Sequence, residues 1–179
     1  MTAIAYKDGI LAADSSCYAG ETYQGEVTKL ARTRDGAVAG ASGDSTLCDE
    51  FLRLFQNSKA DREWLEWRPT IVGSAQFSAV VVMPDGEIRQ LDESGYFPVK
   101  AAFYTEGSAS KLMIGAMAAG ASAEEAVAIA IKYDAHCGGE VQVERLAGER
   151  PQGVATLQRL QAGTQEKVLM RVTGATFRA

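Results

Sequence analysis

The sequence contains one histidine and three cysteines in 179 residues. The single histidine, His136, excludes metal sites built on several histidines and leaves a serine–histidine–aspartate triad only one possible base. The cysteines, Cys17, Cys48 and Cys137, are odd in number and irregularly spaced, unlike those of a disulfide scaffold or a zinc site. The sequence therefore predicts a reducing, cytoplasmic location and a chemistry that does not depend on several histidines or thiols.

Long apolar runs and basic stripes are also missing. No segment has the length of a membrane span, and the N-terminus lacks the basic and apolar regions of a signal peptide. The net charge is −5, and phosphate-binding glycine loops are absent. These features argue against membrane and nucleic-acid partners, while the 46% apolar content fits one domain over residues 1–179 with a sizeable core.

Asp-Gly pairs predict three β-hairpins. This dipeptide favours tight hairpin turns because both residues tolerate positive φ angles. The flanking segments pair, roughly, residues 3–6 with 10–13, 28–32 with 37–41, and 77–83 with 87–91. The sequence therefore predicts at least six strands, mostly antiparallel.

Helices are expected between and after these hairpins. Residues 45–58 carry apolar side chains at helical spacing, with Ser45 as the N-cap. Residues 107–139 form two alanine-rich helices, and Ser122 opens a capping box at the start of the second. Residues 140–146 then alternate like a strand.

This order of elements predicts an α+β fold. Two antiparallel sheets would pack face to face with helices outside, which gives a four-layer αββα sandwich. Residues 147–179 form a C-terminal extension without an assigned role, in which residues 166–177 fit one more strand or hairpin.

Thr2 follows Met1 directly. Methionine is usually removed before a small residue, which would give Thr2 a free α-amine with a reference pKa of about 7.7–8.0. An N-terminal threonine combines nucleophile and base and needs no histidine. A hairpin midpoint at Asp8 would pair Thr2 with Asp14 on one face of the sheet. By themselves, these two residues favour the simpler interpretation, in which Thr2 is an ordinary second residue and Asp14 an ordinary strand-end aspartate.

Two further residues favour the reactive interpretation of Thr2. Lys29 lies among apolar neighbours, and a buried lysine needs a carboxylate partner. Its charge would lower the pKa of a nearby amine. Gly43 lies at the end of a predicted strand, where a free N–H group could stabilise an oxyanion.

Later segments offer three more polar candidates. Ser108 opens a predicted helix, where it can contact a site or simply act as an N-cap. Asp134 and Cys137 are three residues apart at a helix end and would share a face. The alternative role of Asp134 is to cap the following loop.

Together, these segments resemble the proteasome β-subunit family of N-terminal nucleophile hydrolases, which includes the bacterial HslV peptidases. The resemblance covers about residues 2–146 and follows the family's order through Thr2 and five segments: GILAADSS, TKLAR, AGASGD, EGSASKL and DAHCGGEVQVERL.

The resemblance implies a threonine-type peptidase or amidohydrolase, with Thr2 as nucleophile and its own amine as general base. Asp14 and Lys29 would orient and tune this pair, and the N–H of Gly43 would form the oxyanion hole. The resemblance places three more residues around the amine: Ser108, Asp134 and Cys137, the last where the proteasome pattern usually has serine.

The resemblance also implies partners. It suggests a homo-oligomeric ring, a polypeptide substrate and an ATPase unfoldase. No cofactor is implied, although analogy with HslV allows a structural monovalent cation near residues 134–139.

Two alternatives stay open. The chain could be a catalytically inactive relative that keeps the fold as a structural or assembly protein. A thiol hydrolase built on Cys137 and His136 is disfavoured, because adjacent residues project in different directions.

Overall fold

The computed structural model describes residues 2–58, 63–71, 73 and 75–146. All of them belong to one unit of the chain, residues 1–149. The extension at 147–179, with the strand or hairpin predicted at 166–177, lies outside the described residues.

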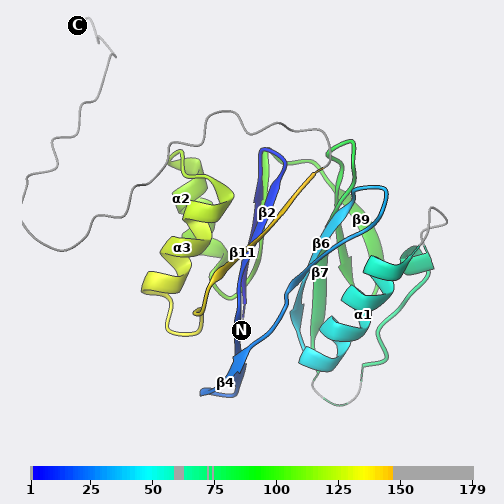
Figure 1. Cartoon of the computed structure of the whole chain (residues 1–179), viewed down its shortest axis with the longest axis horizontal. Helices are drawn as coiled ribbons and strands as arrows, with labels where there is room; N and C mark the ends of the chain where they lie inside the picture. Colours follow the sequence, from blue (N-terminus) through cyan, green and yellow to red (C-terminus); the bar gives the residue numbers. More distant parts are fainter. Residues whose placement is uncertain (1, 59–62, 72, 74, 147–179) are drawn as a thin grey trace, which may run out of the picture. The chain divides into compact units, whose positions relative to one another are not determined.

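Antiparallel pairing organises the strands into two large sheets and one short ribbon (Figure 1). The first sheet has the order β10 (Phe103–Gly107), β1 (Ala3–Lys7), β2 (Ile10–Asp14) and β11 (Val141–Arg145). The second has the order β5 (Leu30–Arg32), β6 (Val38–Gly43), β7 (Phe77–Val82), β8 (Ile88–Asp92) and β9 (Gly95–Val99). The ribbon pairs β3 (Ser16–Ala19) with β4 (Thr22–Glu26), two strands that the sequence analysis did not predict.

Helices cover the outer face of each sheet (Figure 1). Helices α2 (Ser110–Ala118) and α3 (Ala123–Tyr133) pack on β1 and β2, whereas α1 (Ser45–Asn57) and the 3-10 turn η1 (Glu63–Leu65) pack on the second sheet. No helix in the described ranges combines the length and apolar character that a membrane crossing requires.

Three apolar clusters fill the interfaces between these layers. One joins α2 and α3 to the alanines of β1 and β2, and another joins α1 to the second sheet. Between the sheets, Ile4 and Leu11 meet Val38, Val80 and Val82. Alternate residues of each strand thus enter different clusters, and the arrangement confirms the predicted αββα sandwich.

Local chemistry explains where the helices begin and end. Asp44, rather than Ser45, caps α1, because its Oδ1 accepts hydrogen bonds from the backbone N–H groups of Thr46 and Leu47. The predicted capping box of Ser122 is present. Helix α3 ends at Tyr133 with Asp134 as its C-cap, before the glycine pair at which the sequence analysis ended it.

In all three predicted hairpins the expected segments pair with each other. The registers of the first and second hairpins differ by one residue from those that the predicted ranges imply, and the first of these differences affects the site. Asp8 and Gly9 form a two-residue turn with φ angles of 49° and 74°. Lys7 therefore pairs with Ile10, and the same register places Asp14 opposite Ala3, rather than opposite Thr2, across the two strands. The prediction was wrong because it centred the turn on Asp8 alone, and an odd shift changes which side chains share a face.

Candidate active site

Thr2 lies just before β1 and is buried, between two cavities. The larger cavity has a volume of about 900 Å³ and the smaller one about 320 Å³. Thr2 and Gly43 line both of them. These two residues therefore lie where the two cavities meet.

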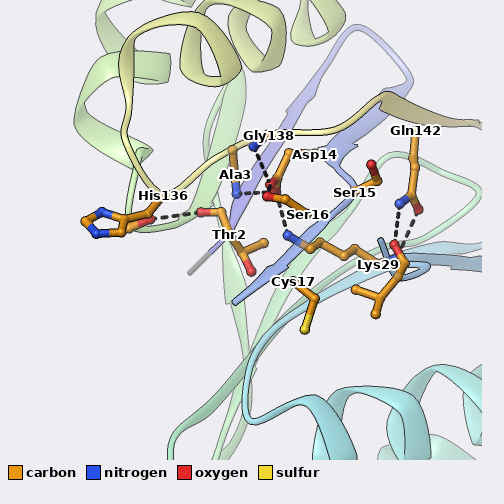
Figure 2. A network of polar contacts seen from close by, with 12 residues as sticks. Thr2, Ala3, Asp14, Ser15, Ser16, Cys17, Lys29, His136, Gly138 and Gln142 are labelled. Carbon is orange, nitrogen blue, oxygen red and sulfur yellow. Dashed lines mark hydrogen bonds and ion pairs between the residues drawn. The ribbon is translucent and has the colours of Figure 1, made fainter. Parts of the chain in front are cut away.

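Asp14 is the centre of a buried polar network beside Thr2 (Figure 2). Its Oδ1 accepts hydrogen bonds from Lys29 Nζ at 2.7 Å and from Ala3 N at 2.9 Å. Its Oδ2 accepts from Ser16 Oγ at 2.7 Å and from Gly138 N at 3.2 Å. Four donors therefore compensate the carboxylate for its burial, as a buried charge requires.

Lys29 brings a buried positive charge to the site. The residue is only 5% exposed, and its ammonium group forms the ion pair with Asp14. Lys29 also lines the smaller cavity together with Thr2, and Figure 2 shows both side chains directed into the same region. The ion pair expected from the sequence is present, and it places a cation at the wall of the Thr2 cavity.

Gly43 occupies a position that only glycine can take. Its φ angle is +119°, and a Cβ atom would lie 2.1 Å from the carbonyl oxygen of Gln76. The strand end can therefore pack closely against the residue before β7. The backbone of Gly43 is thereby held at the junction of the two cavities.

Gly107 makes a second close approach, which the sequence analysis missed. A Cβ atom there would lie 2.0 Å from the carbonyl oxygen of Thr2, and its φ angle is +95°. The glycine within EGSASKL was the available signal, but nothing in the sequence showed which backbone it would meet. The end of β10 thus fixes the position of Thr2 directly.

Ser108 contacts Thr2 rather than capping a helix. Helix α2 begins at Ser110, and its N-cap is Ala109. Ser108 Oγ donates a hydrogen bond to the carbonyl oxygen of Thr2 at 3.4 Å, and the residue lines the larger cavity.

Asp134, His136 and Cys137 lie beside the network but line neither of the two cavities described above. The Asp134 carboxylate accepts from the backbone N–H of His136 at 2.8 Å, a contact within its own loop. Burial raises the pKa of the Cys137 thiol to about 12, and the charges of Asp14 and Asp134 add to this shift. The thiol is therefore protonated at neutral pH and is a poor nucleophile.

The loop at residues 134–139 joins the network through Gly138. Its N–H donates to Asp14, and its carbonyl oxygen accepts from the N–H groups of Ser15 and Ser16. The carbonyl of Asp134 accepts from Cys137 N, so two loop carbonyls already have partners. Among the described residues, no group of three acidic, histidine or cysteine side chains is placed to hold a metal. The structural monovalent cation expected near this loop stays a prediction.

Ser16 also belongs to the network, although it was not among the predicted site residues. The pair Ser15-Ser16 after Asp14 was visible, but only the turn of the chain into β3 directs the Ser16 hydroxyl back to the carboxylate.

Comparisons with known proteins identify the fold. No protein-family model matches the sequence, and no curated protein matches it. The structure is similar to BPH of Thiobacillus denitrificans in complex with epoxomicin, at 20% identity and a TM-score of 0.56, covering 82% of this chain and 98% of that one. A further structure of that BPH gives 20% identity and a TM-score of 0.55, with 83% and 99% covered.

Eukaryotic HslV from Trypanosoma brucei is similar at 19% identity and a TM-score of 0.60, covering 80% of this chain and 97% of that chain. The chain therefore has the proteasome-like, HslV-type fold that the resemblance implied.

Proposed function

We propose that this chain is a threonine-type N-terminal nucleophile hydrolase that cleaves amide bonds, as a peptidase or amidohydrolase. The observation that carries the proposal is the position of Thr2 at the junction of two cavities, beside the buried pair of Lys29 and Asp14. Cleavage of the bond between Met1 and Thr2 would free the α-amine that the reaction needs.

Acylation would begin when the Thr2 hydroxyl attacks the carbonyl carbon of the amide. The hydroxyl proton passes to the α-amine of Thr2, and the carbonyl oxygen becomes an oxyanion, which the N–H of Gly43 would stabilise. The C–N bond then breaks, and the α-ammonium group donates the proton to the nitrogen of the leaving amine. The acyl group remains as an ester on Thr2.

Deacylation would reverse these roles with water. The α-amine takes a proton from water as its oxygen attacks the ester carbon. The ester C–O bond breaks, the Thr2 oxygen recovers the proton, and the carboxylic acid leaves.

Lys29 would tune the amine. A positive charge close to the α-amine disfavours its protonated form and so lowers its pKa. The free base is then more abundant near neutral pH. Asp14 would hold the Lys29 ammonium in place, and Ser108 would fix the backbone of Thr2 through its carbonyl. We assign Asp134 and Cys137 a supporting role, in which they stabilise the loop that carries Gly138.

We extend the proposal to the assembly and substrate. The fold likeness to HslV supports a homo-oligomeric ring that acts on polypeptides, with an ATPase unfoldase as a further partner. Light scattering of the purified protein would test the ring. A cytoplasmic location stays a prediction from the composition.

The decisive test is intact mass before and after treatment with epoxomicin. Its epoxyketone offers two electrophilic carbons, which suit the hydroxyl and the amine of one N-terminal threonine. We expect loss of Met1 and one covalent adduct that maps to Thr2. Thr2→Ala should fold normally, yield no adduct and show no turnover.

A protein that retains Met1, or a Thr2→Ala variant that reacts as well as the parent, would contradict the mechanism. A processed parent that assembles as a ring but does not react would instead favour the inactive structural relative.

A further inference from the structure

We infer that Gln142 is a positioning residue that holds the chain segment carrying Lys29 in its active geometry. This inference rests on the proposed function. Gln142 lies on β11, at the edge of the first sheet, where its backbone pairs with Ala13 of β2. The alternating pattern of residues 140–146 predicts only a strand and indicates no role for Gln142.

The side-chain amide of Gln142 bridges to the segment formed by residues 27–29. Its Oε1 accepts from the backbone N–H of Lys29 at 3.0 Å, and its Nε2 donates to the carbonyl oxygen of Val27 at 2.6 Å. Figure 2 shows both contacts beside the Lys29 backbone. The amide thus takes the place of a neighbouring strand, because one group supplies both an acceptor and a donor.

The bridged segment needs such support because it lies between two strands. Residues 27–29 belong to neither β4 nor β5. The N–H of Val27 donates to the Ser15 carbonyl, and the carbonyl of Lys29 accepts from Ala41 N. Gln142 supplies the partners of the remaining backbone groups of Val27 and Lys29, so three separate parts of the fold fix these two residues.

Two properties of the site depend on where this segment lies. The backbone position of Lys29 determines whether its Nζ reaches Asp14 at 2.7 Å and faces the cavity of Thr2. Val27, Thr28 and Lys29 together also form one wall of the smaller cavity. Gln142 therefore determines both the position of the Lys29 ammonium group beside the amine and the shape of the smaller cavity. It does so without lining either cavity itself.

The substitution Gln142→Met tests this role because it keeps the side-chain length, removes both hydrogen bonds and changes no charge. The titratable groups that line the two cavities stay in the sequence: Cys17, Tyr18, Lys29, Asp44, Cys48, Asp49 and Glu106. If Lys29 withdraws from the cavity, its positive charge no longer disfavours the protonated form of the Thr2 amine. The pKa of that amine then rises.

The measurement is the rate of epoxomicin adduct formation at Thr2 across pH 5 to 10. We expect Gln142→Met to lower the rate at neutral pH about tenfold, equivalent to about 1.4 kcal/mol, and to move the pH midpoint upward. The matched control is Gln56→Met, the same chemical change on the exposed face of α1. It should leave both the rate and the midpoint as in the parent.

Hydrogen exchange at the amide of Lys29 gives a readout that does not need activity. Gln142→Met should speed this exchange, while Gln56→Met should not. Gln142→Glu keeps the oxygen that accepts from Lys29 N–H but loses the donor to Val27. It should therefore protect the amide better than the methionine variant, and it serves as the test if that variant does not fold.

The outcomes separate the two proposals. A parent protein that forms no adduct overturns the proposed function, and this inference with it. If the parent reacts, two results would overturn the role of Gln142 alone. In the first, Gln142→Met forms the adduct as fast as Gln56→Met. In the second, Gln142→Met forms it more slowly, but the pH midpoint and the exchange of the Lys29 amide are unchanged.

Discussion

Asp14 and Asp134 are both candidate site residues, but their surroundings differ. Asp14 is fully buried and accepts hydrogen bonds from the N-terminal segment, β3, Lys29 and the loop at Gly138. The side chain of Asp134 is 23% exposed, and its carboxylate bonds within its own loop. One carboxylate thus joins distant parts of the chain, whereas the other ends a helix. Only the first is placed to control the charge beside Thr2.

The largest effect should follow from Asp14→Ala. It leaves the Lys29 ammonium buried without its carboxylate, and breaking a buried ion pair in this way costs about 3–5 kcal/mol. Urea unfolding would measure the loss. Asp134→Ala is the matched control, and an equal loss in the two variants would remove the difference drawn between these aspartates.

Lys29→Met should separate stability from reactivity. Asp14 keeps three donors, and methionine fills a similar volume, so we expect a smaller loss of stability than for Asp14→Ala. Adduct formation at Thr2 should nevertheless fall by about a hundredfold or more, because the charge that favours the free amine is gone. A variant that reacts at the parent's rate would show that the ion pair is only structural.

Asp134→Asn should have a small effect. The asparagine oxygen can still accept from His136 N, so the loop keeps its main contact. We expect the unfolding free energy to change by no more than about 0.5 kcal/mol and adduct formation to stay within about threefold of the parent. A loss as large as that of Lys29→Met would place Asp134 in the reaction.

The smallest effect at neutral pH is expected for Cys137→Ser. The thiol has its pKa raised from 9.0 to about 12, so it stays protonated and should resist iodoacetamide in the folded protein at pH 8. Because the folded state holds this proton more tightly than the unfolded state, stability is retained below pH 9 and falls as pH rises toward 12.

Alkaline urea unfolding should show a shallower fall for Cys137→Ser than for the parent. Rapid alkylation of Cys137 at pH 8, or complete loss of turnover in this variant, would revive the thiol mechanism.

The turns and helix starts were predictable where local chemistry decides them. Asp-Gly pairs marked the hairpins, and Ser122 with Glu125 marked the start of α3. The register of the first hairpin was not predictable in the same way, because it depends on how many residues enter the turn. That single residue determined whether Thr2 or Ala3 is the cross-strand partner of Asp14.

The site was predictable as a set of residues but not as a geometry. A lysine among apolar residues calls for a carboxylate, and the structure supplies Asp14. The sequence offered no reason to expect that Gly107 meets the Thr2 backbone, or that Gln142 bridges to residues 27–29. These contacts join residues more than a hundred positions apart.

The sequence by itself determined the alternation of strands and helices, the order of the candidate residues and the need for a buried cation to be paired. These follow from short-range periodicity, turn chemistry and the cost of burying charge. The tertiary structure alone decided which backbone groups complete the network and where the two cavities open beside Thr2. Such contacts depend on how the two sheets and the loop at Gly138 pack together, and no local pattern encodes that packing.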